Sequence, residues 1–315
     1  MSFAFGFSPN VEMTFKIIYA LLISFTLLFV IWKKVSPKTF QEELLERTKS
    51  WWIIISLIFV ALGFGKTSTI WMLAFLSFVA LRELLSNVPL SINDRKAVFW
   101  CYLGIPIQFY AISIGYYHFF IIWVPVILFI ILALRRIAID ETENFTQSLG
   151  VLLFANLLIV YSLGHMAYLM VLDIPYDKNV GNDGLLLYLL FLTQFNDVLQ
   201  FIWGKLLGKR KISPKVSPNK TWEGFLGGLI CTTILGYVFR FLTPLNEIQS
   251  LTAGFLIAFM GFFGDLNMST IKRDMGVKDM GNIIPGHGGI MDRIDSLSFS
   301  SLVFFHLVHM WTRGM

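Results

Sequence analysis

Long apolar runs separated by short polar segments dominate the chain. A membrane-spanning helix needs roughly 20 mostly apolar residues, and about ten segments approach that length. They lie near residues 13–32, 51–65, 68–85, 97–113, 116–134, 146–172, 184–207, 222–243, 250–268 and 297–312. The pattern predicts an all-α integral membrane protein, a polytopic bundle of about ten transmembrane helices. The second segment is short and could pair with the third as a re-entrant hairpin.

The polar segments alternate in charge. Lysine and arginine concentrate in every second connection, at 33–49, 82–96, 135–143, 205–220 and 272–293. The intervening connections carry few basic groups, namely Lys66, His118, Lys178 and Arg240. By the positive-inside rule, the first set faces the cytoplasm and the N-terminus lies outside. We expect an inner (plasma) membrane protein of bacterial type with a cytosol-facing polar cleft. Residues 36–50 are predicted to form an interfacial helix.

The composition agrees with a membrane location. The chain of 315 residues is 56% hydrophobic and only 14% charged, with a mean hydropathy of +0.69. The net charge of +5 fits cytoplasmic loops that contact anionic headgroups, and no nucleic-acid-binding module is visible. Cys101 and Cys231 lie inside apolar runs, as small core residues do. We divide the chain into N-terminal transmembrane helices, 1–135, and a C-terminal catalytic region, 136–315.

One stretch near the C-terminus breaks the apolar pattern by mixing three kinds of residue. The basic ones, which neutralise phosphate oxygens, are Lys272, Arg273, Lys278 and Arg293. The acidic ones, which suit Mg²⁺, are Asp265, Asp279, Asp292 and Asp295. The glycines, which let backbone amides approach a ligand, are Gly286, Gly288 and Gly289. The combination indicates a site for phosphates and a metal ion.

The order of these residues resembles the signature of the phosphatidate cytidylyltransferases, also called CDP-diacylglycerol synthases. The matching pattern is Ser269-x-x-Lys272-Arg273-x-x-x-x-Lys278-Asp279-x-x-x-x-x-Pro285-x-His287-Gly288-Gly289-x-x-Asp292-Arg293-x-Asp295. Upstream, residues 215–228, which include SerProAsnLysThrTrpGluGly, and the GlyAsp pair at 264–265 are similar to other blocks of that family. The resemblance covers the C-terminal third well and the N-terminal part only as a series of apolar segments.

The resemblance implies a reaction and its partners. A lipid phosphate, phosphatidic acid in the typical members, attacks the α-phosphorus of CTP and expels pyrophosphate, which leaves a CDP-linked lipid. The implied partners are CTP, the lipid phosphate and membrane lipids, with Mg²⁺ and a possible second cation as cofactors. The nucleophile is already an anion, so charge neutralisation and positioning should matter more than a strong general base.

The resemblance and the residue types together suggest roles for individual side chains. The expected metal ligands are Asp197, Asp265 and Asp292. The expected catalytic residues are Lys272, Arg273, Lys278, Asp279, His287, Arg293 and Asp295. The expected substrate-binding residues are Ser217, Asn219, Lys220, Ser269, Gly286, Gly288 and Gly289. Lys220 precedes a predicted helix, whose free N-terminal amides favour a phosphate.

Each of these assignments has a plainer alternative. Asp197 could pair with a buried polar group inside the bundle. Asp292 and Asp295 could be caps of the last helix. His287 could bond to backbone in place of a phosphate. Most of the basic loop at 205–221 could contact lipid headgroups, as isolated charge runs usually do.

Two features leave the function of the whole chain open. After Asp197 the chain reads ValLeuGlnPhe, where the family usually has two small residues, Ala and Tyr, and Met268 stands where Glu is usual. The acceptor could therefore be a different lipid phosphate. A transporter of anionic solutes would also have many spans and a basic vestibule, although the polar residues cluster at one face. A third possible function, that of the CDP-alcohol phosphotransferases, requires an AspGly-x-x-AlaArg motif, which is absent.

Small residues in 297–306 could support a homodimer.

Overall fold

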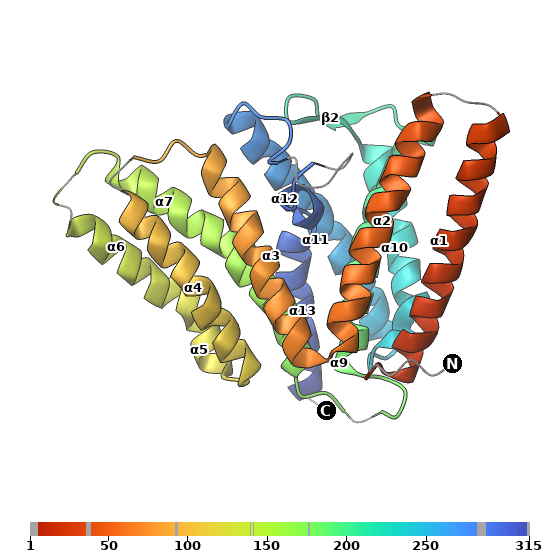
Figure 1. Cartoon of the computed structure of the whole chain (residues 1–315), viewed down its shortest axis with the longest axis horizontal. Coiled ribbons are helices and arrows are strands. Elements are labelled where there is room, and N and C mark those ends of the chain that lie inside the picture. Colours follow the sequence, from red (N-terminus) through yellow and green to blue (C-terminus); the bar gives the residue numbers. More distant parts are fainter. Residues whose placement is uncertain are drawn as a thin grey trace.

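A computed structural model shows a bundle of long helices (Figure 1). It describes residues 6–35, 39–91, 94–138, 140, 142–175, 177–281 and 288–313. The first part contains α1 (Pro9–Val35), α2 (Thr39–Gly63), α3 (Lys66–Asn87) and α4 (Arg95–Ser113). Two longer runs follow, each with an internal π-helical stretch: α5 (Tyr117–Ile122), η2 (Trp123–Leu128) and α6 (Phe129–Ile137), then α7 (Phe145–Asn156), η3 (Leu157–Tyr161), α8 (Ser162–Tyr168) and η4 (Leu169–Val171).

The last part of the chain carries the polar motifs. Its elements are α9 (Asn182–Leu207), β1 (Lys211–Ser213), β2 (Ser217–Thr221), α10 (Trp222–Val238), η5 (Phe239–Leu242), α11 (Glu247–Asp274), α12 (Met291–Ile294) and α13 (Leu297–Arg313). A single apolar core includes buried residues from both parts, from Val11 in α1 to Val308 in α13.

Seven helical segments in the described part of the chain are long and apolar enough to cross a membrane. They are Pro9–Trp32, Lys66–Asn87, Tyr117–Ile137, Phe145–Val171, Asn182–Leu207, Trp222–Leu242 and Glu247–Asp274. Shorter apolar helices occupy Thr48–Gly63 and Leu297–Thr312. The ten predicted segments all lie largely in helices, which confirms a helical membrane protein. A total of ten crossings stays a prediction.

One local expectation was wrong. The interfacial helix predicted at 36–50 is not a separate element, because α2 runs unbroken from Thr39 to Gly63; no proline or internal glycine interrupts it. The loop before α10 contains two short strands that the sequence did not reveal, β1 and β2, which pair as an antiparallel hairpin. The Glu223 carboxylate accepts hydrogen bonds from the backbone amides of Lys209 and Arg210, which holds the start of this hairpin against α10.

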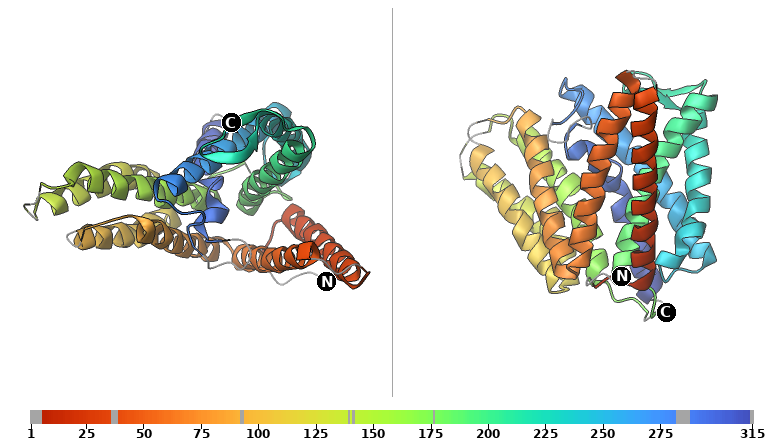
Figure 2. Two further views of the ribbon diagram at one scale, coloured as in Figure 1. Left: turned by 90° about the horizontal axis from the view of Figure 1, so that it is seen from above. Right: turned by 45° about the vertical axis from the view of Figure 1, so that its right-hand side comes forward.

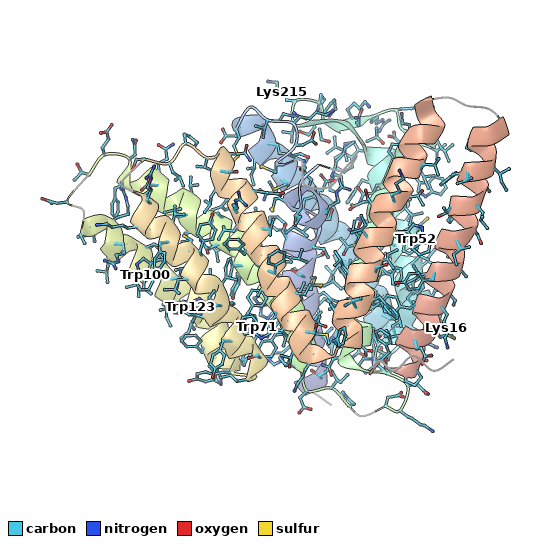
Figure 3. The ribbon with its side chains drawn as sticks, viewed as in Figure 1. Lys16, Trp52, Trp71, Trp100, Trp123 and Lys215 are labelled. Atoms are coloured by element: carbon cyan, nitrogen blue, oxygen red, sulfur yellow. The ribbon has the colours of Figure 1, made fainter. Side chains whose placement is uncertain are left out.

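The helix ends that flank the basic connections share one end of the bundle. In Figure 1 the start of α2, the end of α3 and the β1–β2 hairpin lie at the top, and the start of α1 and the end of α13 lie at the bottom. Lys215 in the hairpin and Lys16 in α1 mark the two ends in Figure 3. The alternation of charge along the sequence therefore corresponds to a real separation in space.

Glycines set the distance between the helices that carry the polar motifs. A methyl group on Gly224 of α10 would lie 2.7 Å from the Gln200 carbonyl oxygen of α9. A methyl group on Gly236 would lie 2.7 Å from the Ser250 carbonyl oxygen and 2.8 Å from Gly254 of α11. These contacts are with backbone, which cannot rotate away. Small residues therefore bring α9, α10 and α11 together, whereas α1 and α2 form a pair at the edge (Figure 2).

We expect Gly236→Ala to destabilise the bundle, because the added methyl group forces α10 and α11 apart. The cost should be about 1–3 kcal/mol of unfolding free energy. Gly150→Ala in α7 is the matched control, since nothing lies within 4 Å of the position that its methyl group would take. Thermal unfolding in detergent measures both. Equal melting temperatures for the two variants would contradict the close approach.

Candidate active site

A cavity of about 220 Å³ opens between α9, β2, α10 and α11. Asp197 and Gln200 come from α9, and Asp265 comes from α11. The other lining residues are Phe201, Ser217, Asn219, Lys220, Thr221, Gly224, Phe225 and Phe262. Five of the residues predicted to bind metal or substrate therefore lie on one cavity, although they are up to 68 positions apart in the chain.

Lys220 is held against the Asp265 carboxylate. Its Nζ lies 2.8 Å from Asp265 Oδ2, and the side chain is only 14% exposed. The same Nζ donates to the Phe262 carbonyl oxygen at 3.4 Å and lies 4.4 Å from the centroid of the Phe262 ring. Ser269 Oγ donates to the other oxygen of Asp265 at 3.3 Å, which confirms that α11 continues and places both residues on one face. The ammonium group is thus fixed at the cavity before any ligand binds.

Asp197 and Asp295 are joined by a residue that the sequence did not single out. Ser296 Oγ donates to both carboxylate oxygens of Asp197, at 3.1 and 3.0 Å. The backbone amide of Ser296 donates to Asp295 Oδ1 at 2.8 Å. Burial, and then repulsion by the Asp265 carboxylate, raise the pKa of Asp295 to about 7. The charges on α9, on α11 and at the start of α13 therefore act on each other.

Asp292 has a different environment, in which both of its oxygens are used. Its Oδ1 accepts from Lys272 Nζ at 2.9 Å, and its Oδ2 accepts from the amides of Met280 and Gly289, both at 3.0 Å. The side chain is 4% exposed. Gly288 has a φ of +79°, and a methyl group there would lie 2.8 Å from Asp292 Oδ2. Lys272 and Gly288 are thus placed around Asp292.

The remaining predicted residues are more dispersed. Arg273 Nε donates to the carbonyl oxygen of Val216 in the hairpin turn. Lys278 and Asp279 are exposed after the end of α11. Arg293 is half-buried on α12, where its charge lowers the pKa of Asp295 and so partly offsets the effect of burial. Gly286 and His287 lie outside the described residues.

The carboxylates suit a magnesium ion by their chemistry and position. No group of three or more Asp, Glu, His or Cys side chains forms a ready metal site within the described ranges. Mg²⁺ is usually held by one or two protein carboxylates together with substrate phosphates and water. Asp197 and Asp265 on the shared cavity could supply two such ligands. The roles of Asp197, Asp265 and Asp292 as ligands stay predictions.

A second residue that the sequence did not reveal is Glu83 on α3. It is 6% exposed and accepts hydrogen bonds from the amides of Ile290 and Met291, at 3.0 and 2.8 Å. The pairing spans 207 positions. In the sequence, the one sign of a role for Glu83 is that an acidic residue stands among apolar residues. The sequence does not show which amides it meets.

Comparison with known proteins identifies similar sequences. The sequence model described as "Cytidylyltransferase family" matches residues 45–311. The "Uncharacterized protein YnbB" of Escherichia coli (strain K12) is 38% identical over 300 residues, which are 94% of this chain and 98% of that protein. The "Phosphatidate cytidylyltransferase" of Staphylococcus haemolyticus (strain JCSC1435) is 46% identical over 122 residues, which are 38% of this chain and 47% of that protein. For the protein of the same name from Haemophilus influenzae, the identity is 42% over 135 residues, or 46% of its length.

We expect Asp292→Ala to lower the free energy of unfolding by about 3–5 kcal/mol, because it leaves the Lys272 ammonium buried without its partner and removes the acceptor of two amides. Asp274→Ala, at the exposed end of α11, is the matched control and should change stability by less than about 0.5 kcal/mol. Chemical unfolding in detergent measures both. Similar values for the two variants would show that Asp292 is not a structural centre.

Proposed function

Because the chain belongs to the cytidylyltransferase family, we propose that it transfers the cytidylyl group of CTP to a lipid phosphate, with phosphatidic acid as the first candidate acceptor. An oxygen of the lipid phosphate forms the new bond to the α-phosphorus of CTP. The bond from that phosphorus to the oxygen bridging the β-phosphorus breaks, and pyrophosphate leaves. The family match over residues 45–311 carries this proposal, and the cavity shared by Asp197, Lys220 and Asp265 supports it.

The side chains at the cavity suit a reaction between two polyanions. Lys220 is already oriented by Asp265 and Phe262, so little side-chain freedom remains to be lost when a phosphate binds. Lys272, Arg273 and Arg293 supply further positive charge at the same end of the bundle. Such fixed charges stabilise the transition state more than the separated substrates, because they require no reorganisation as charge develops. Positioning the two phosphates in line is the second contribution.

In this scheme Asp197 and Asp265, which line the cavity, would hold a Mg²⁺ ion through their carboxylate oxygens. The sequence motif adds Asp292 as a further candidate ligand and Asp279 as a supporting residue. When bound, the ion would neutralise phosphate oxygens and polarise the α-phosphoryl group. Ser296 holds both oxygens of Asp197 and so orients that carboxylate. Ser269, one turn along α11, donates to one oxygen of Asp265, and Lys220 pairs with the other. The acidic residues would also permit a second cation, which the proposal does not require.

The membrane location gives the cavity a physical purpose. We place the basic end of the bundle in the cytoplasm, at the inner membrane, because basic connections favour that side and because nucleotides are found there. The acyl chains of the acceptor can then stay in the bilayer while the phosphate reaches the cavity. Removing a lipid from the bilayer would instead expose many methylene groups at about 0.8 kcal/mol each.

One observation favours a second acceptor, a lipid phosphate other than phosphatidic acid. Gln200 lines the cavity, and its Nε2 has no hydrogen-bond partner among the described residues. The typical family members carry small residues after the aspartate that corresponds to Asp197. A polar side chain here changes what the cavity can accept, because an unsatisfied buried donor selects for ligands that supply an acceptor.

A direct assay tests the function. Purified protein, CTP labelled at the α-phosphate and Mg²⁺ are incubated with a panel of lipid phosphates, and the label is followed into the lipid phase with release of pyrophosphate. We expect label in a CDP-linked lipid with at least one acceptor, and the ratio of kcat/KM values ranks the acceptors. Label that stays in CTP with every acceptor would contradict the proposal. Passage of unmodified CTP or phosphate into sealed vesicles would favour a transporter.

We expect Asp265→Asn to lower kcat/KM by on the order of 10²–10³, because the change removes a carboxylate charge that helps hold the metal and orients Lys220. The Mg²⁺ concentration for half-maximal rate should rise. Asp274→Asn, on the same helix and exposed, is the matched control and should leave both quantities unchanged. Near-normal turnover of Asp265→Asn with an unchanged Mg²⁺ dependence would refute the role of Asp265.

A further inference from the structure

The N-terminal helices contribute a buried carboxylate to the segment that carries the C-terminal motif. Glu83 lies near the end of α3, and Asn87 follows one turn later on the same face. Within the described residues, no basic side chain forms an ion pair with Glu83; its oxygens accept from backbone amides instead. A buried carboxylate without a counter-ion is costly unless several donors satisfy it. The position of Glu83 therefore requires an explanation beyond packing.

Glu83 replaces a missing cap on α12. This short helix begins at Met291, and its capping position is Ile290, whose side chain makes no capping hydrogen bond. The first amides of any helix lack partners within the helix. The two oxygens of Glu83 accept from two consecutive amides, those of Ile290 and Met291. A side chain from α3 thus fixes the start of the element that carries Asp292 and Arg293.

The glycines of the motif are shaped to fit this carboxylate. A methyl group on Gly289 would lie 2.5 Å from Glu83 Oε2, and one on Gly281 would lie 2.7 Å from Glu83 Oε1. The same methyl group on Gly289 would lie 2.8 Å from the backbone nitrogen of Gly281. Gly281 and Gly289 therefore both lie close to the Glu83 carboxylate. Gly289, predicted from sequence to bind substrate, has a packing reason to be glycine.

Asn87 and Asp292 hold the backbone of Met280, next to Gly281. Asn87 Nδ2 donates to the carbonyl oxygen of Met280 at 2.9 Å and to that of Glu83 at 2.8 Å. Asp292 accepts from the amides of Met280 and Gly289 and holds Lys272. Asp292 and Asn87 thus hold Met280, while Asp292 and Glu83 hold the backbone from Gly289 to Met291. Asp292 also fixes the Lys272 ammonium.

From these contacts we infer that Glu83 is a positioning residue for cytidylyl transfer. It fixes the backbone at Ile290 and Met291 and so the start of α12, and through α12 the placement of Lys272, Asp292 and Asp295. It touches no reacting atom at the cavity. The inference rests on the proposed function for its chemical readout. It also means that the active site is not confined to region 136–315, because α3 supplies one of its supports.

Glu83→Gln tests this inference in the full-length protein. The amide keeps the shape but has only one acceptor oxygen for two amides, so kcat should fall on the order of ten- to hundredfold through misplacement of the reacting groups. KM for the lipid phosphate should stay within about twofold, since Glu83 lies off the cavity. Glu83→Asp, which keeps the charge, should retain more activity than Glu83→Gln. Glu247→Gln, on the exposed start of α11 and paired with Arg240, is the matched control and should behave as wild type.

Hydrogen exchange gives a readout that does not depend on activity. The amides of Ile290 and Met291 should exchange faster in Glu83→Gln than in wild type, while peptides from α9 and α10 keep their protection. Unchanged exchange at both amides, or a kcat within about twofold of wild type, would overturn the inference. If Glu83→Gln loses protection throughout the protein, the test passes to Asn87→Ala, and a kcat of that variant within about twofold of wild type would then overturn the inference.

The two proposals can fail separately. If wild-type protein transfers no cytidylyl group to any lipid phosphate, the proposed function fails, and the exchange experiment still decides whether Glu83 holds α12. If wild-type protein is active and Glu83→Gln retains its kcat, only the inference fails. Should Glu83→Gln fold poorly, Asn87→Ala takes its place. This change removes the hydrogen bond from Asn87 to the Met280 carbonyl and should also lower kcat.

Discussion

Carboxylates inside or beside the apolar bundle need partners, and this need shapes the polar end of the bundle. A charge that leaves water inside an apolar bundle must find an opposite charge or several hydrogen-bond donors. Asp265, which is 27% exposed, pairs with Lys220, Asp292 pairs with Lys272 and accepts from two amides, and Glu83 accepts from two amides. These contacts connect α11 with β2 and with α12, and α3 with the start of α12.

The sequence predicted the helices well because helix formation in a membrane is a local matter. Every backbone group must be paired within the segment, so an apolar run of sufficient length is almost always a helix. The alternation of basic and less basic connections also predicted that the basic ones share one end of the bundle. This pattern can be seen in the sequence without knowing how the helices pack. The continuous α2 and the β1–β2 hairpin were missed. The polar residues within 36–50 and 205–221 suggested that the neighbouring helix ends there. Instead, backbone hydrogen bonds continue α2 through the first segment and pair two strands in the second.

The site was predictable where residues lie in recognisable blocks and not where they act alone. Asp197, Lys220 and Asp265 line one cavity, whereas Asp292 is not among its lining residues. The motif resemblance suggested that these residues belong to one site, which is long-range information that periodicity lacks. Ser296 and Glu83 belong to no such block. A serine beside Asp295 and a glutamate at the end of α3 look like ordinary polar residues at helix ends, and only the folded chain shows which carboxylate or amide each one meets.

The contacts of Glu83 change how similarity within this family should be interpreted. The blocks that carry the chemistry lie in the C-terminal third, yet their geometry is set partly by α3, which lies outside them. A relative that shares only those blocks need not share the support, whereas YnbB matches 94% of this chain. The proposed reaction would depend on Lys220, Asp265 and Asp292, whereas the surrounding helices hold these residues in place. Gln200 lines the same cavity as Asp197 and Asp265, so this residue could affect which acceptor binds next to the proposed metal ligands.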